Sequence, residues 1–180
     1  MSLNLQAVFE FQMVMFWLVL DTMIRGVRFD QQHRSEFALM LGDEIAKREQ
    51  WFIDVLGHPL NPKSGPQMKR LFYEDLKLPL QKNRKTGAPS LDDESLNKLV
   101  NKEPLVKPIV RKISEYRSLG VFLSTFVQAP LDRDNRMRCS YNVAGTETFR
   151  LSSSENAFGS GTNLQNVPKG GDEGNGLELP

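Results

Sequence analysis

One stretch of the chain gathers side chains that could bind another polar molecule: TFRLSSSENAFGSGTNLQNVP, from Thr148 to Pro168. It places one arginine, Arg150, before a run of serines, a glycine-containing linker and the residues NLQN. Guanidinium groups donate several hydrogen bonds, and serine, asparagine and glutamine side chains both donate and accept them. Packing alone does not require these residues in this order, so the stretch is the first candidate for a functional site.

The rest of the sequence carries no recognisable catalytic or metal-binding pattern, so we predict no catalytic residue and no metal ligand. Neither a G-x-S-x-G sequence nor a phosphate-binding glycine loop is present. The two histidines, His33 and His58, lack the cysteines with which they could bind zinc. No carboxylate pair of the D-x-D or D-x-x-x-E type is expected at a strand end, and Cys139 is expected to be a small buried hydrophobe.

Length and charge allow a folded domain with a local basic surface. The chain has 180 residues, 39% of them hydrophobic, and a net charge of +1. Residues 1–60 carry 5 basic and 8 acidic side chains, residues 61–90 carry 7 and 2, and residues 101–150 carry 9 and 5. Two basic zones suit an anionic polymer, although solvated helix faces produce such runs too. The single cysteine excludes an internal disulfide and favours an intracellular protein.

Two long helices are predicted before residue 60. The apolar stretch Ala7–Leu20 is shorter than the roughly 20 residues that cross a bilayer, and it lacks the flanks of a signal peptide. We therefore predict a core helix that ends near Arg25, with Gly26 as its left-handed cap and an extended link after it. Asp30 then caps an amphipathic helix that ends at about Leu56.

Shorter elements follow. Ser64 and Gln67 fit a capping box before a short helix whose buried stripe is Leu71, Phe72 and Leu76. Either Ser90 or Asp92 caps a helix that ends at about Asn101. A further helix begins near Pro104, because prolines are tolerated in a first turn. The alternating pattern at 136–143 predicts a strand, and the glycine-rich acidic end predicts a loop or a hairpin tip.

The segment GTETFRLSSSENAFGSGTNLQNVP resembles the TxTxRLSSxxPNLQNIP signature of the family A DNA polymerases, the relatives of bacterial DNA polymerase I. Other segments resemble the family in the same order and extend the likeness to nearly all of the chain: DTMIRGVRFD, LNPKSGPQMKRLFYEDLKLPL, the K-x-x-K-T-G turn at 82–87, EYRSLGVFLSTFV and RMRCSYNVAGTETFRLSS.

The resemblance implies a fold and a division of the chain. It predicts a mainly α protein with a small antiparallel β region, of the α+β class. Residues 1–130 would form the helical thumb with its base helices, and residues 131–180 the start of the palm. In the family, the thumb grips the primer-template duplex and the RLSS to NLQN region lies beside the primer terminus.

The resemblance also assigns DNA-binding residues. Arg150 matches the arginine that reaches the minor groove, where purine N3 and pyrimidine O2 accept hydrogen bonds from every base pair, so that pair shape rather than sequence is read. The alternative for each polar residue is that it only satisfies backbone groups of its own loop. The full set is Thr146, Thr148, Arg150, Ser152, Ser153, Asn163, Gln165 and Asn166 in the segment 146–166, and Ser64, Lys85, Arg117, Ser124 and Thr125 in the helical part.

Three features depart from the family pattern. Val121 and Leu123 replace two lysines of the thumb helix, which should flatten the salt dependence of DNA binding. The basic zone between Lys63 and Lys85 could compensate for this loss. Phe149 replaces a glycine, and the linker before NLQN is lengthened to ENAFGSGT, as in viral branches of the family, which suggests a bacteriophage source.

The resemblance implies that the chain holds only part of an enzyme. Family A polymerases use two Mg²⁺ ions held by palm carboxylates, and these follow the NLQNIP segment. We therefore expect the 180 residues to need no cofactor and to be unable to polymerise alone, whereas the parent protein would be a DNA-directed DNA polymerase of replication or repair. Its partners would be primer-template DNA and the rest of the palm and fingers, with no membrane, in the cytoplasm of a bacterial or phage-infected cell. The sequence leaves a processivity factor open.

Two other interpretations remain open from the sequence. The chain could be a free-standing, non-catalytic DNA-binding protein derived from a thumb, or a helical interaction module with no nucleic-acid role. If it is a fragment, its apolar first helix and its palm edge lack neighbours, which predicts poor solubility or self-association.

Overall fold

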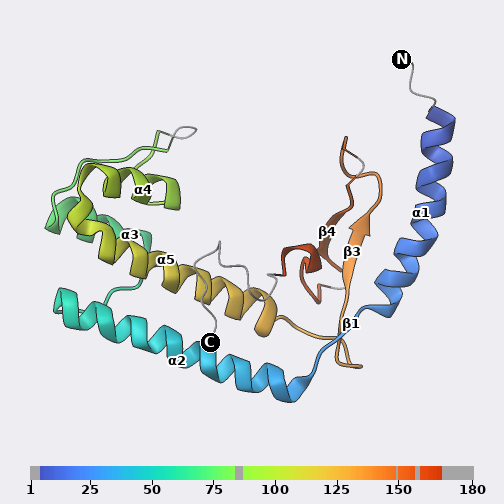
Figure 1. Cartoon of the computed structure of the whole chain (residues 1–180), viewed down its shortest axis with the longest axis horizontal. Helices are drawn as coiled ribbons and strands as arrows, with labels where there is room; N and C mark the ends of the chain where they lie inside the picture. Colours follow the sequence, from blue (N-terminus) through green and yellow to red (C-terminus); the bar gives the residue numbers. More distant parts are fainter. Residues whose placement is uncertain (1–4, 84–86, 149, 157–158, 168–180) are drawn as a thin grey trace. The chain divides into compact units, whose positions relative to one another are not determined.

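The computed structural model describes residues 5–83, 87–148, 150–156 and 159–167. The described chain is mainly helical and contains two small antiparallel sheets of two strands each, which confirms the predicted fold class (Figure 1). It forms two compact units. We call the part with Met1–Ala38 and Leu123–Gly170 the ribbon unit, and the part with Leu39–Phe122 the helical unit. The predicted thumb and palm division at residue 130 stays a prediction.

The helical unit is built around one apolar core. Its elements are the later part of α2 (Gln31–Leu56), α3 (Gly65–Lys69), the π-helical turn η1 (Arg70–Asp75), α4 (Asp93–Lys102), the 3-10 turn η2 (Pro104–Val106) and α5 (Lys107–Phe122). Phe52, Phe72, Leu96, Leu99 and Ile113 are fully buried in this core. Burial of such side chains contributes roughly 1.5–3 kcal/mol each, so this cluster is the main source of stability for the unit.

The predicted buried stripe after Ser64 is confirmed for two of its three residues. Leu71 and Phe72 are 3% and 0% exposed, whereas Leu76 is 37% exposed. The chain widens into a π-helical turn over Arg70–Asp75, and the additional residue in this turn shifts Leu76 off the buried face. The prediction for Leu76 is therefore wrong.

The ribbon unit contains α1 (Leu5–Arg25), the first part of α2, the π-helical turn η3 (Leu123–Val127), all four strands and the 3-10 turn η4 (Leu164–Asn166). Strand β1 (Val27–Arg28) pairs with β2 (Arg136–Met137), with Val27 opposite Met137. Strand β3 (Cys139–Asn142) pairs with β4 (Ser152–Glu155), with Cys139 opposite Glu155. The strand predicted at 136–143 is thus interrupted at Arg138, where the chain changes from one partner strand to another.

Most predicted helix ends are confirmed. Gly26 adopts a φ of 60° after α1, and the carboxylate of Asp30 accepts hydrogen bonds from the amides of Gln32 and His33 at the start of α2. Asp92, not Ser90, is the N-cap of α4, because its Oδ1 accepts from the Ser95 amide at 2.8 Å.

The capping box at Ser64 is only half formed. The Ser64 hydroxyl accepts from the Gln67 amide at 3.5 Å, but the Gln67 side chain accepts from the Asn61 amide at 2.8 Å and not from that of Ser64. The glutamine closes the loop before α3 instead of the first turn of the helix.

Helix α1 is not the core helix that its composition predicts. Val19 is its only buried residue, and Phe9, Phe16 and Trp17 are 61%, 41% and 64% exposed. The helix has 21 residues, longer than the apolar stretch in the sequence, and by length and composition it could cross a membrane. Signal sequences near an N-terminus meet the same two criteria. The prediction of a buried helix is therefore wrong for the described chain, since one side alone packs on β3 and nothing described covers the rest.

Candidate nucleic-acid interface

The ribbon that carries the RLSS and NLQN residues is held together by its own polar side chains. The Ser153 hydroxyl on β4 donates to Oδ1 of Asn163, the N-cap of η4, and the same oxygen accepts from the Gln165 amide at 3.0 Å. Nε2 of Gln165 donates to the Leu151 carbonyl at 3.0 Å. Three residues predicted from the sequence, Ser153, Asn163 and Gln165, therefore form one cluster at the start of β4.

Arg150 lies in the loop between β3 and β4, and its side chain points to solvent. Its backbone carbonyl accepts a 2.7 Å hydrogen bond from the Thr146 hydroxyl, and both residues are exposed, as is Thr148. Among the residues that the structure describes, the guanidinium of Arg150 has no ion-pair partner. A cation that is exposed, unpaired and attached to a fixed backbone is available to bind an external acceptor.

Ser152 and Asn166 complete the ribbon set. Ser152 is half-buried on β4, and a Cβ atom on Gly145 would lie 2.4 Å from its hydroxyl, so the loop returns closely over it. Asn166 is exposed at the end of η4. Phe149, which stands where the family pattern has glycine, lies outside the described residues.

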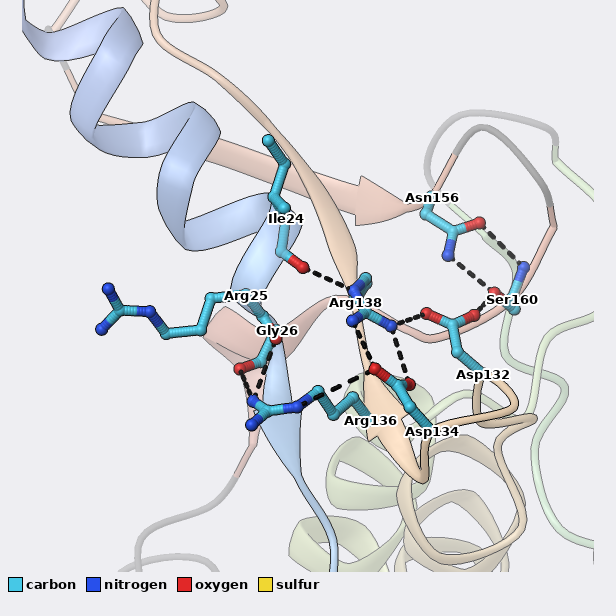
Figure 2. Close-up of polar contacts among 9 residues, drawn as sticks. All are labelled: Ile24, Arg25, Gly26, Asp132, Asp134, Arg136, Arg138, Asn156 and Ser160. Atoms are coloured by element: carbon cyan, nitrogen blue, oxygen red, sulfur yellow. Dashed lines mark hydrogen bonds and ion pairs between the residues drawn. The ribbon is translucent and has the colours of Figure 1, made fainter.

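Sequence reasoning missed a charged cluster at the base of this ribbon. Figure 2 shows Arg138 between the end of α1 and the turn that carries Asp132 and Asp134. Its Nη1 lies 2.6 Å from Asp132 Oδ2, its Nη2 lies 2.6 Å from Asp134 Oδ2, and its Nε donates to the Ile24 carbonyl at 2.7 Å. Nη1 of Arg136 donates to the carbonyls of Arg25 and Gly26. We call Arg138, Asp132 and Asp134 the arginine node.

The contacts within the arginine node shift the pKa values of all three of its side chains. The hydrogen bond from Arg138 lowers the pKa of Asp134 to about 2. Hydrogen bonds from Arg138 and from the Ser160 hydroxyl lower the pKa of Asp132, and the two carboxylates raise the pKa of Arg138. Both aspartates are therefore ionised at neutral pH and paired with the guanidinium, so they do not fit a Mg²⁺ ion.

A signal for this node was present in the sequence. Asp132 and Asp134 are followed, across Asn135, by Arg136 and Arg138 in the run DRDNRMR. Asn135 adopts a φ of 60°, so the chain reverses there and the second pair returns over the first. Opposite charges that alternate at a spacing of two on both sides of a turn residue predict such pairing across the turn.

The helical unit holds the other predicted DNA-binding residues, and Arg117 is bonded within it. Its Nε donates to the Pro62 carbonyl at 3.0 Å and its Nη1 to the Leu91 carbonyl at 2.9 Å, and Nη1 lies 3.6 Å from Asp93 Oδ1. The structure thus gives Arg117 a structural role, and its contact with DNA stays a prediction.

The remaining predicted residues are spread over both units. Ser64 is the N-cap of α3 in the helical unit, whereas Ser124 and Thr125 lie in η3 of the ribbon unit. Lys85 lies outside the described residues. Lys63, the first residue of the basic zone, lies against α5, because a Cβ atom on Gly120 would lie 2.6 Å from its Nζ.

The described residues contain no group of three or more histidine, cysteine, aspartate or glutamate side chains that could hold a metal ion. A small pocket lies between the end of α1, β3 and η4, and Thr22, Met23, Cys139, Tyr141 and Leu164 line it. Burial, together with a hydrogen bond to Cys139, raises the pKa of Tyr141 to about 12. The pocket is mostly apolar, and Arg25 also lines it.

Comparison with known proteins gives one consistent result. Residues 31–177 match the sequence profile of DNA polymerase family A. The chain is 35% identical over 148 residues to thermostable DNA polymerase I of Thermus aquaticus, an alignment that covers 79% of this chain and 17% of that protein. It is 30% identical over 147 residues to DNA polymerase I of Bacillus subtilis, covering 79% and 16%.

A solved structure shares the fold. The POL domain of Pol1 from M. smegmatis, in a complex with DNA primer-template and dNTP, matches with a TM-score of 0.62 and 24% identity. The match covers 82% of this chain and 25% of that one. The chain spans about one sixth of the length of the two curated relatives above.

Proposed function

Because this chain belongs to DNA polymerase family A, we propose that it is the primer-template-binding part of a DNA-directed DNA polymerase of replication or repair. The observation that carries the proposal is the exposed Arg150, which has no ion-pair partner in the described part of the chain, together with the cluster of Ser153, Asn163 and Gln165. The M. smegmatis relative of similar fold is a complex with primer-template DNA, which supports a DNA partner for this chain.

The chemistry of Arg150 suits a sequence-independent contact. In the minor groove, purine N3 and pyrimidine O2 present acceptors at every base pair, and a guanidinium can donate to either. A correct pair places these acceptors in nearly the same position whatever its sequence, whereas a mispair moves them. An arginine on a fixed ribbon would therefore test the shape of the pair and tolerate any template.

The proposal assigns this chain binding and positioning but no bond-forming step. In the complete enzyme, two Mg²⁺ ions would activate the primer hydroxyl and stabilise the leaving pyrophosphate. Asp132 and Asp134 do not fit that task because both carboxylates are already paired with Arg138. We propose that the metal-binding carboxylates belong to parts of the polymerase outside these 180 residues, and that the chain alone extends no primer.

Duplex binding tests the proposal directly. The affinity of the chain for a primer-template would be measured by fluorescence anisotropy at about 50 and 200 mM salt, with two duplexes in which A·T and G·C pairs are exchanged. Loss of a charged hydrogen-bond donor costs about 1.5–3 kcal/mol, so Arg150→Ala should weaken binding to both duplexes roughly 10- to 100-fold.

Arg25→Ala is the matched control, since Arg25 is also an exposed arginine of the ribbon unit and its side chain pairs with Asp21 on α1. It should leave the affinity within about twofold. A parent chain that fails to bind duplex at low salt would contradict the proposal. So would an Arg150→Ala variant that binds as tightly as its parent.

A further inference from the structure

The lengthened linker before NLQN is attached to the arginine node by one serine. The Ser160 hydroxyl donates to Asp132 Oδ1 at 2.7 Å, and Oδ2 of the same carboxylate accepts from Arg138 (Figure 2). Asp132 therefore uses both oxygens, one toward Arg138, which lies between β2 and β3, and one toward the linker.

Three hydrogen bonds join Asn156 to Ser160 across the linker. The Asn156 amide donates to the Ser160 carbonyl at 3.1 Å, and the Ser160 amide donates to Asn156 Oδ1 at 3.1 Å. Nδ2 of Asn156 donates to the Ser160 hydroxyl at 2.6 Å. Asn156 directly follows β4, so the turn begins where the strand that carries Ser152 and Ser153 ends.

The turn also lies directly on the backbone at Arg138. The Gly161 amide donates to the Pro130 carbonyl at 3.0 Å, and a Cβ atom on Gly161 would lie 1.9 Å from the Arg138 carbonyl oxygen. Only two residues separate Ser160 from Asn163, the side chain that accepts from both Ser153 and Gln165. The ribbon is thus fixed at its linker end by the node and at its NLQN end by β4.

We propose that Ser160, together with Asp132 and Arg138, positions the DNA-contacting ribbon, so that a side-chain lock holds the lengthened linker. This inference rests on the proposed function and adds three positioning residues that touch no DNA themselves. Through the lock, Asn156, Ser160 and Gly161 hold Asn163 and, across the β3–β4 pair, the loop of Arg150 in the geometry that meets the minor groove.

Ser160→Ala tests the lock with little risk of unfolding, since it removes one oxygen atom from a half-buried side chain. A neutral hydrogen bond contributes about 0.5–1.5 kcal/mol, so duplex affinity should fall roughly 2- to 10-fold. Ser160→Thr keeps the hydroxyl and should restore the affinity. Ser154→Ala, the same change at an exposed position on β4 outside the node, should have no effect.

A double variant separates positioning from general destabilisation. If Ser160 acts through Arg150, then Ser160→Ala in an Arg150→Ala background should reduce affinity by less than about twofold, because the contact that it positions is already lost. An equal loss in both backgrounds would overturn the inference. So would a Ser160→Ala variant that binds duplex as tightly as the parent.

Amide hydrogen exchange without DNA tests the lock independently of the proposed function. In Ser160→Ala, the Gly161 and Gln165 amides should exchange at least about fivefold faster, while the Leu96 amide at the start of α4 should be unchanged. If the parent chain does not bind duplex, the proposed function fails, and the exchange rates still show whether Ser160 holds the ribbon. Unchanged exchange at Gly161 and Gln165 would overturn the lock even if DNA binding is confirmed.

Discussion

The Nε atom of Arg117 lies 3.0 Å from the carbonyl oxygen of Pro62, so a side chain of α5 holds the loop that precedes α3. The same guanidinium donates to the Leu91 carbonyl in front of α4. One arginine thus joins three elements of the helical unit through backbone groups. A residue that the family resemblance assigns to DNA binding has a structural task in this chain, and the two roles predict different results.

Arg117→Ala should destabilise the helical unit. It removes two hydrogen bonds from a charged donor and leaves two carbonyls without that donor, at a cost of about 2–3 kcal/mol in the free energy of unfolding measured in urea. Arg117→Lys should recover only part of this loss, because an ammonium group cannot reproduce the geometry of the guanidinium.

Arg111→Ala provides the control for that measurement. Arg111 lies on the same helix and pairs with Glu115, but its side chain is 76% exposed, so its loss should cost less than about 0.5 kcal/mol. If Arg117→Ala instead keeps full stability and binds duplex more weakly, then the main role of Arg117 is the DNA contact that the sequence predicts.

Gly161→Ala should be far more damaging than Gly159→Ala. Both glycines have positive φ angles, 77° and 74°, so alanine strains the backbone by about 1–2 kcal/mol at either position. A Cβ atom on Gly159 meets no atom within 4 Å, whereas on Gly161 it would lie 1.9 Å from the Arg138 carbonyl. The two variants would be compared by their melting temperatures and by amide hydrogen exchange near residue 161. The difference between them therefore measures the contact between Gly161 and Arg138. Equal effects of the two substitutions would show that Gly161 does not lie against the backbone of Arg138.

His33 should titrate above its ordinary pKa of 6.5 because its ring is hydrogen-bonded to the Asp30 carboxylate. The raised pKa means that protonated His33 stabilises the folded chain. This contribution is fully present below about pH 6.5 and is lost as the pH rises through the folded-state pKa. Proton NMR can follow the ring directly, since the chain has only two histidines.

Asp30→Asn is the variant that isolates this pair. Asparagine caps a helix about as well as aspartate, so α2 should keep its first turn while the His33 pKa falls toward 6.5. A His33 midpoint that is the same in both proteins would show that Asp30 does not pair with the imidazole.

Val121→Lys should restore part of the salt dependence that the family pattern implies. Val121 is 55% exposed on α5, so a lysine there can reach a phosphate without disturbing the core. Each phosphate contact adds about −0.9 to the slope of log K against log salt, which sets the expected change for duplex binding. Val121→Gln has a similar length without the charge and should leave the slope unchanged. An unchanged slope in Val121→Lys would place this face of α5 away from the DNA backbone.

Local chemistry made much of the fold predictable from the sequence. Gly26, Asp30 and Asp92 act on amides or dihedral angles within a few residues, so their positions are enough to locate helix ends. The burial of α1 was not predictable in the same way. Its apolar composition predicts that some surface will cover it, but the sequence does not say that the described chain lacks that surface.

The interruption of the strand at Arg138 could not be predicted from the sequence for a related reason. Alternation continues through the whole segment 136–143, and the change of partner is set by Val27 on one side and by Ser152–Glu155 on the other. The ribbon residues could be found because they form a contiguous motif that resembles a family. The contact between Ser160 and Asp132 of the node could not be found that way, since these two residues are separated by 28 positions and meet only in the folded chain.

Cys139 is the only cysteine of the chain and is 2% exposed beneath α1 and η4. Thiol-reactive dyes attack accessible sulfur atoms, so the parent chain should resist maleimide labelling. A cysteine introduced at an exposed position, such as Ser154, would then take a single fluorophore without any prior removal of native thiols. The protein is therefore suited to fluorescence experiments that follow the ribbon through one label at a chosen position.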